Sequence, residues 1–373
     1  MNVPKLRFKE FNDEWSYQSL SKYVNRITTK NKNNESNLVL TISAQYGLVD
    51  QTNFFNRSVS SSNLTGYYLL NNGDFAYNKS YSNGYPWGAV KRLNKYNQGV
   101  VSSLYICFKP NDLINSDFLE QYFETNKWYQ QISEVSVEGA RNHGLLNIAV
   151  NDFFNTKHYI PSIKEQEKIS NFLSLLDKKI ELQSKKIEDL KLFKLSKYNS
   201  VFSKSNNIIK LSDICKIEKG KQINSDLLRA EGNYYMLNGG ILPSGYLNEY
   251  NTNENTITIS EGGNSCGYVN FNKTKFWCGG HCYKIISSSV NASYLYHLLK
   301  YNEKIIMDLR VGSGLPNIQR KDLEKLKLSI HKSDDQLKIG ILFDTFDKKI
   351  NLETNRLNKF KELKKGLMQS IFV

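Results

Sequence analysis

The feature that most constrains the fold is an internal repeat. Residues 147–202 and 317–372 align without gaps at a constant offset of 170, and 17 of the 56 aligned positions are identical. The identities include the run DKKI at 177–180 and 347–350. A repeated phrase of this kind folds as the same unit in each copy, so the chain is expected to contain two similar halves.

The apolar residues within each copy predict a long helix. They recur in alternating steps of three and four, a period typical of coiled coils. Gln183 and Glu353 interrupt the two stripes at equivalent positions, which favours packing of the helices on each other as an antiparallel pair in a fixed register. The predicted helix-helix packing residues are Ile169, Leu173, Leu176, Ile180, Ile187 and Leu190, and Ile339, Phe343, Phe346, Ile350, Leu357 and Phe360.

The helix starts are also predicted from the sequence. Pro161 stops an upstream helix, and Ser162 stands three residues before Glu165, the spacing of a capping box. Ser333 and Gln336 repeat that spacing. A helix from 162 to about 200 would be roughly 57 Å long at 1.5 Å per residue, which suits a spacer.

Each helix is preceded by a segment of different character. Residues 1–146 and 206–316 are rich in Asn, Ser, Gly, Tyr and Thr, with short β-favouring runs at 38–42, 100–108, 256–259 and 283–286. We therefore predict an α+β protein with two globular domains, 1–155 and 206–325, and two helical segments, 156–205 and 326–373. Because the domains differ in sequence and length, they are expected to bind different targets.

The charge of the chain favours a polyanionic partner. Its 50 Lys and Arg residues exceed its 36 Asp and Glu residues, giving a formal charge of +14, and nucleic acid heads the list of partners. No 18-residue apolar run and no secretory signal is found, so a cytoplasmic protein without a membrane partner is expected. Cys266, Cys278 and Cys282, with His281, lack paired zinc-ligand spacing, and no metal site is predicted.

The chain resembles the specificity subunit of type I restriction-modification systems. The phrases GSGLPNI at 312–318 and IPSIKEQEKI at 160–169, together with the duplication, carry the resemblance. The first domain lacks the proline before Asn147, and the second helix opens on His331 and Lys332 instead of Pro-Ser. These departures weaken the motifs locally and leave the duplication intact.

The resemblance implies a non-catalytic subunit that binds double-stranded DNA. In that family each target-recognition domain recognises one half of a bipartite, asymmetric site, and the helices set the spacing. The subunit would dock two adenine methyltransferase subunits and two restriction subunits that translocate DNA. It would bind no cofactor itself, since S-adenosylmethionine, ATP and magnesium are expected on the partner subunits.

Several loops have the composition of a DNA interface, in which amide, hydroxyl and basic side chains contact base edges and phosphates. They follow a β run in each domain, precede the repeated Asn-Ile, or form the short basic turn at 219–221. The alternative is a solvated turn with Tyr85 and Trp87 packed inward. The candidates are Lys79, Tyr81, Ser82, Asn83, Tyr85, Trp87, Lys91, Arg92, Arg141 and Asn142 in the first domain, and Lys219, Lys221, Ser260, Asn264, Ser265, Arg310, Ser313 and Asn317 in the second.

An enzyme is not indicated, and no catalytic residue is predicted. Neither an S-adenosylmethionine loop nor a nucleotide-binding loop is found, because Gly220-Lys221 is followed by Gln222. Asp177 and Asp347 are interpreted as lying on the solvated face of the helix pair. His143 and His281 have no identifiable catalytic partner. The open alternatives are a non-catalytic scaffold with a coiled coil, a DNA-binding protein outside restriction-modification, and an enzyme acting alone on DNA.

Overall fold

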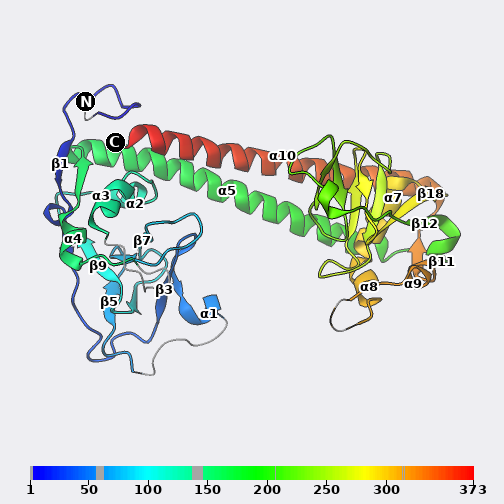
Figure 1. Ribbon diagram of the computed structural model, residues 1–373, viewed down its shortest axis with the longest axis horizontal. Coiled ribbons are helices and arrows are strands. Elements are labelled where there is room, and N and C mark those ends of the chain that lie inside the picture. Colours follow the sequence, from blue (N-terminus) through cyan, green and yellow to red (C-terminus); the bar gives the residue numbers. More distant parts are fainter. Residues whose placement is uncertain (1–2, 56–62, 137–145, 206, 313, 315) are drawn as a thin grey trace. The chain divides into compact units, whose positions relative to one another are not determined.

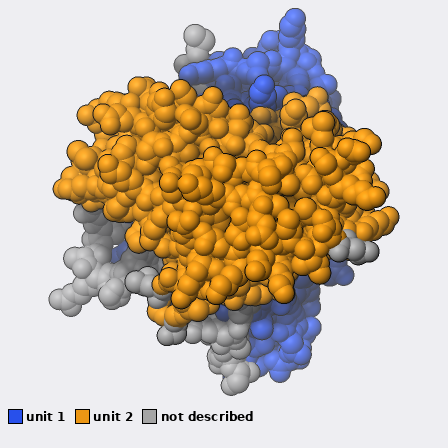
Figure 2. All heavy atoms as spheres, turned by 90° about the vertical axis from the view of Figure 1, so that its right-hand side faces the viewer, with its two compact units in different colours: residues 1–182, 357–373 blue, residues 183–356 orange. Residues whose placement is uncertain are grey.

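The computed structural model describes residues 3–55, 63–136, 146–205, 207–312, 314 and 316–373. The chain divides into two compact units, the first formed by residues 1–182 and 357–373 and the second by residues 183–356 (Figure 2). The two long helices, α5 (Ile163–Phe202) and α10 (Ser333–Ile371), are labelled in Figure 1, and each contributes one part to both units. The two predicted long helices are therefore confirmed, and each unit contains one globular domain with part of each helix.

The domain of the first unit is built around a four-stranded antiparallel sheet with the order β2-β9-β6-β7. The hairpin β3-β4 and the antiparallel pair β5-β8 form two further two-stranded sheets, and β1 pairs with β10 next to the start of α5. The elements are β1 (Ser16–Ser19), the 3-10 turn η1 (Leu20–Lys22), β2 (Val24–Arg26), β3 (Leu40–Ser43), β4 (Gly47–Asp50), α1 (Gln51–Phe55), β5 (Tyr68–Asn71), β6 (Phe75–Asn78), β7 (Ala89–Arg92), β8 (Gln98–Val101), β9 (Ile106–Pro110), α2 (Ser116–Phe123), α3 (Tyr129–Val135), α4 (Val150–Asn155) and β10 (Lys157–Ile160).

The domain of the second unit has a four-stranded sheet with the order β12-β18-β15-β16. A three-stranded sheet, β14-β13-β17, flanks it, and β11 pairs with β19. The elements are β11 (Asn207–Lys210), α6 (Leu211–Ile214), β12 (Cys215–Lys219), the 3-10 turn η2 (Ser225–Leu227), β13 (Tyr234–Leu237), β14 (Gly245–Leu247), β15 (Thr256–Ser260), β16 (Val269–Asn272), β17 (Trp277–Cys278), β18 (Cys282–Ser288), α7 (Ala292–Tyr301), α8 (Glu303–Asp308), α9 (Arg320–Glu324) and β19 (Lys327–Ile330).

The two domains share more structure than their sequences suggest. In chain order the central sheets correspond strand for strand, β2 with β12, β6 with β15, β7 with β16 and β9 with β18. A helix follows the last strand in both, α2 with Asn115 as its N-cap and α7 with Asn291, and each cap side chain accepts a backbone N–H. The repeat therefore extends from the helices into the cores of both domains.

Polar contacts fix the register of the helix pair within each unit. Lys364 Nζ lies 2.6 Å from Asp177 Oδ1 in the first unit, and Lys194 forms the equivalent ion pair with Asp347 in the second. Gln183 Nε2 donates to Glu353 Oε2 at 2.7 Å. In the first unit Lys179 lies over the Phe360 ring, so in each unit the partner number on α10 falls as the number on α5 rises, and the helices are antiparallel. Asp177 and Asp347 thus pair with lysines of the opposite helix while their side chains stay partly exposed, so the face to which they were assigned also carries interhelical ion pairs.

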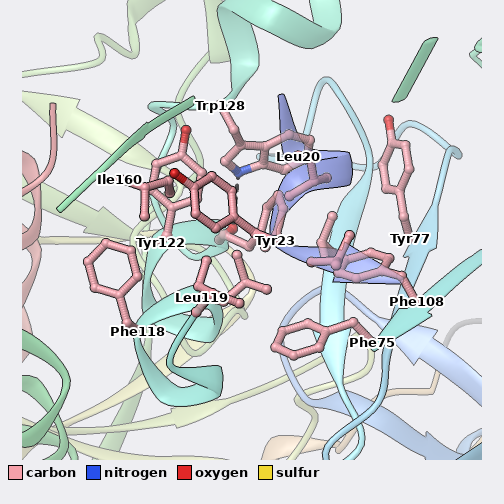
Figure 3. Packing of buried hydrophobic residues seen from close by; sticks show 14 of the residues in the cluster. Leu20, Tyr23, Phe75, Tyr77, Phe108, Phe118, Leu119, Tyr122, Trp128 and Ile160 are labelled. Carbon is pink, nitrogen blue, oxygen red and sulfur yellow. Dashed lines mark hydrogen bonds between the residues drawn. The ribbon is translucent and has the colours of Figure 1, made fainter. Parts of the chain in front are cut away.

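The predicted apolar stripe forms the inner face of the helix pair. All twelve of its residues are buried or half-buried, with Leu173 and Phe343 fully buried. In the first unit this face joins the domain core, where α2 supplies Phe118, Leu119 and Tyr122 beside the sheet residues Phe75 and Phe108 (Figure 3). Each domain is therefore anchored to both helices by its hydrophobic core.

A phenylalanine at the end of each long helix completes the core of one domain. Phe372, the residue after α10, lies 5.3 Å from Phe118, measured between ring centroids, and Phe202, the last residue of α5, lies 5.2 Å from Tyr301. These two phenylalanines occupy equivalent positions of the repeat. Phe202 and Phe372 thus have the same packing role in the cores of the two units.

Three local predictions are corrected by the structure. The run 100–108 forms the ends of two strands, β8 and β9, because residues 102–105 turn between them. Glu165 closes no capping box, because Arg7 Nε and Nη2 both donate to its carboxylate at 2.8 Å. Helix α10 already begins at Ser333, so Ser333 lies in its first turn.

Candidate nucleic-acid interface

In the first unit the loop 79–88 connects β6 to β7 and carries most of the predicted DNA contacts. Mutual backbone hydrogen bonds between Ser82 and Tyr85, at 3.3 and 2.8 Å, close a tight turn. Gly84 has φ +82°, a conformation that favours glycine. Tyr81, Ser82 and Asn83 are exposed on this turn, so three adjacent side chains of different chemistry face solvent.

The aromatic residues that follow point inward, as the alternative interpretation of this loop anticipated. The Tyr77 hydroxyl donates to the Trp87 carbonyl at 2.8 Å, and Trp87 packs against the main core of the unit. Tyr85 packs against the core of the β3-β4 hairpin, and burial raises the pKa of its phenol. Lys79 is half-buried and donates to the Ile148 carbonyl at 3.1 Å.

Lys91 and Arg92 are held by carboxylates of the domain. The buried Lys91 ammonium lies 2.5 Å from Glu124 Oε1. The Arg92 guanidinium bridges Asp117 and Glu120 at 2.7 and 2.6 Å. A phosphate would have to compete with these partners, so the assignment of Lys91 and Arg92 to DNA contact stays a prediction.

Beside the turn lies a cleft of about 1030 Å³, formed entirely within the first unit. Its domain wall includes Gln45 and Tyr46 from the β3-β4 turn, Asn83 from the loop, and Asn126 and Tyr129 near α3. Tyr46 is 61% exposed. The opposite wall is the last part of α10, from Lys361 to Gln369, none of which was predicted to bind DNA.

In the second unit two predicted sets of residues converge. The loop 261–268 connects β15 to β16, and it is hydrogen-bonded along the segment that precedes the repeated Asn-Ile. Ile318 N donates to the Glu261 carbonyl at 2.8 Å, and Gly263 N donates to the Pro316 carbonyl at 3.1 Å. Asn264 is exposed beside this junction, so it is free to contact a ligand.

The first unit has the same arrangement. Leu146 N donates to the Lys79 carbonyl at 2.9 Å, which joins the loop after β6 to the segment before the repeated Asn-Ile. Strands β6 and β15 occupy equivalent positions in the two sheets. Loops predicted to bind DNA from separate stretches of sequence thus meet at the corresponding place in each domain.

The remaining candidates of the second domain differ in accessibility. Ser260 is buried, and its hydroxyl donates to the Gly239 carbonyl at 2.5 Å. Lys219 is paired with Glu261 at 2.6 Å, while Lys221 and Arg310 are exposed. Asn317 is half-buried. Its Oδ1 accepts from Gln319 at 2.8 Å.

Glu261 is a centre of polar contacts in this domain. Besides Lys219, it accepts from the Tyr283 hydroxyl at 3.1 Å, and burial together with this carboxylate raises the pKa of Tyr283. Ser265 is half-buried. Arg141, Asn142, His143 and Ser313 lie outside the described residues.

The described part of the chain shows neither a metal-binding cluster nor a membrane-spanning helix. Among the described residues no group of three or more His, Cys, Asp and Glu side chains is placed to hold a metal ion. All five cysteines are buried thiols. The described helices include none that is long and apolar enough to cross a bilayer.

Comparisons with known proteins agree with this architecture. The fold is similar to that of a type I restriction-modification S subunit from Mycoplasma genitalium, with a TM-score of 0.64 and 20% identity over 100% of this chain and 99% of the other. A second solved structure, of a type I restriction-modification complex, matches with a TM-score of 0.58 and 14% identity over 98% of this chain. The fold is therefore that of a restriction-modification specificity subunit.

Sequence comparison points the same way. Residues 204–362 match the model of the type I restriction modification DNA specificity domain. A type I specificity subunit of Mycoplasma pneumoniae is 34% identical over 161 residues, 42% of this chain and 42% of that protein, and one of Mycoplasma genitalium is 30% identical over 39% of this chain and 40% of its own length. The matches thus span about two-fifths of these relatives. Over these stretches the chain is similar to type I specificity subunits.

Proposed function

We propose that this chain is the DNA-recognition subunit of a type I restriction-modification complex and reads a bipartite, asymmetric site, one half with each domain. One observation carries the proposal. In each unit the loop after the equivalent strand, β6 or β15, meets the segment before the repeated Asn-Ile, and the two surfaces carry different side chains. A formal charge of +14 supports binding of a polyanion.

The chain supplies recognition and its partners supply the chemistry. As a specificity subunit it is non-catalytic, so methylation and cleavage belong to adenine methyltransferase and restriction subunits that dock on it. S-adenosylmethionine, ATP and magnesium would then be bound by those subunits. The long helices suit a role in fixing the spacing of the half-sites, since the 40 residues of α5 extend over about 60 Å.

The proposal is tested by altering one exposed side chain in each domain. Asn83 and Asn264 both end in an amide that can pair with adenine. In cells that express the chain with its methyltransferase subunit, Asn83→Ala should relax methylation at one half of the site, and Asn264→Ala at the other. Asn171→Ala, on the exposed face of α5 in the first unit, is the matched control and should leave the motif unchanged.

Two outcomes would count against this proposal. If both domain variants altered the same half, the assignment of one half-site to each domain would be wrong. If the chain formed a stable complex with the methyltransferase subunit but no methylated motif depended on it, a scaffold role would replace DNA recognition.

A further inference from the structure

The wall that α10 contributes to the cleft of the first unit is one continuous helix face. Its residues are Lys361, Lys364, Lys365, Met368 and Gln369. These positions follow the spacing i, i+3, i+4, i+7, i+8, which places side chains on one side of a helix. Met368 is buried and anchors this face to the core. The helical spacing and the anchoring by Met368 therefore turn these lysines toward the cleft.

The charges of the cleft do not cancel. Its lining contains three carboxylates, and each has a cationic partner: Glu124 with Lys91, Glu120 with Arg92, and Asp177 with Lys364. Three further lysines line the cleft, Lys95, Lys361 and Lys365, and all are exposed. None of these three makes a hydrogen bond or ion pair within the part of the chain that the structure describes. The cleft thus keeps an excess of about three positive charges.

The rest of the lining fits nucleic acid. Amide side chains of Gln45, Asn83 and Asn126 can bond base edges or sugar and phosphate oxygens. Tyr46 and Tyr129 interleave aromatic rings with the basic groups. A docking surface for a protein would instead be expected to offer a larger apolar centre.

Among the described residues, the cavity at the corresponding place in the second unit is smaller and less basic. On the corresponding stretch of the helix pair a smaller cavity of about 220 Å³ is lined by Phe271, Lys273, Tyr296, Asp344, Asp347 and Asn351. Its helix residues are two carboxylates and an amide. Asp347 is the repeat equivalent of Asp177, whereas the residue equivalent to Lys365 is Leu195. Lys191 and Lys194 repeat Lys361 and Lys364, so the two units differ at the position of Lys365 and in the cavity beside the helices.

We propose that this lysine face of α10 binds the phosphate backbone of duplex DNA held in the cleft, so that α10 contacts the ligand directly at the first half-site and acts as more than a spacer. The inference rests on the proposed function and adds a contact from a helix to those of the domain loops. Lys361 and Lys365 supply the free charges from α10, and Lys95 supplies one from the domain wall.

The salt dependence of DNA binding tests this proposal. The full chain, in complex with its methyltransferase subunit, is titrated with a duplex that bears the methylated motif mapped in cells. Each phosphate contact contributes about 0.9 to the slope of log K against log salt. The double variant Lys361→Gln and Lys365→Gln should make this negative slope shallower by about 1.8. From 50 to 200 mM salt the wild type should therefore lose roughly 12-fold more affinity than the variant.

The control removes the same amount of charge from two exposed lysines outside the cleft, one on α5 and one on α10. Lys178 and Lys359 are exposed in the first unit and lie outside the cleft, so Lys178→Gln with Lys359→Gln should keep the wild-type slope. Equal slopes for all three proteins would overturn the lysine-face proposal while leaving DNA recognition in place. Loss of the methyltransferase subunit from the Lys361 and Lys365 variant, with an unchanged slope, would also overturn it and indicate a protein-docking face. Absence of any motif-dependent binding by the wild type would overturn the proposed function as well.

Discussion

Truncating the phenylalanine at the end of each long helix should destabilise one unit and spare the other. Phe372 is 1% exposed and Phe202 is 2% exposed, so each ring is almost wholly removed from water. An aromatic side chain that buries about 150–200 Å² contributes roughly 4–5 kcal/mol at 25 cal/mol per Å². This agrees with about 3–5 kcal/mol for Phe→Ala in a core. We expect about 4 kcal/mol for Phe372→Ala and for Phe202→Ala.

The assay is hydrogen exchange of backbone amides, followed by mass spectrometry in low concentrations of urea. Phe372 contacts Phe118 and Tyr122 of α2, so Phe372→Ala should lower protection in Ser116–Phe123. Phe202 contacts Tyr294 and Tyr301 of α7, so Phe202→Ala should lower protection in Ala292–Tyr301. Because the two residues are 170 positions apart in the repeat, each variant is the control for the other.

The prediction is tested by which helix, α2 or α7, loses protection in each variant. Loss of protection in α7 after Phe372→Ala, or in α2 after Phe202→Ala, would refute the claim that each helix end completes one domain core. A decrease in the free energy of unfolding of less than about 1 kcal/mol in both variants would mean that the helix ends fray and contribute little to the cores.

Three further predictions concern pH and backbone geometry. Burial lowers the pKa of His158 to about 4 from 6.5, so between these pH values the unfolded chain binds a proton that the folded first unit does not. The urea midpoint of unfolding should therefore fall as the pH drops from 6.5 to 4. His158→Gln should remove that dependence. Lys186 and then Gln183 lower the pKa of Glu353 to about 2 from 4.5. The stabilisation by this carboxylate is therefore present above pH 4.5 and is lost as the pH falls toward 2. Glu353→Gln should make the melting temperature less dependent on pH over that window. Gly88 has φ +76°, and an added Cβ would lie 2.2 Å from the Asn78 carbonyl oxygen. Gly88→Ala should therefore lower the free energy of unfolding by more than about 1–2 kcal/mol, measured by denaturant titration. Gly66→Ala is the control and should lower it less, because the space at its Cβ is open.

The helices were predictable from the sequence because their pattern is local and duplicated. A stripe of period 3.5 requires no knowledge of distant partners, and the matched interruptions at Gln183 and Glu353 indicated their pairing, which the hydrogen bond between them confirms. The role of Asp177 was missed because its partner Lys364 is 187 residues away. The offset of 170 contained a usable signal, since both Asp177 and Lys364 have identical residues at their equivalent positions.

The domains were harder to predict because strand order depends on pairing between distant segments. No local pattern reveals that β2 pairs with β9 and β12 with β18 in matching sheets. The candidate site was predicted in part. The loops after β6 and β15 were placed correctly as equivalent, but the Trp87 side chain packs against the domain core and the Ser260 hydroxyl bonds within its domain. The lysine face of α10 was overlooked, although Lys361 and Lys365 stand four residues apart, a spacing that puts them on one face of a helix.

The central claim is that this chain directs methylation to a two-part DNA site. It is tested most directly by single-molecule sequencing of adenine methylation in cells that contain the methyltransferase subunit with and without this chain. We expect a gapped, asymmetric motif that is methylated only when the chain is present. No new motif, with a methyltransferase subunit shown to be active with another specificity subunit, would contradict it.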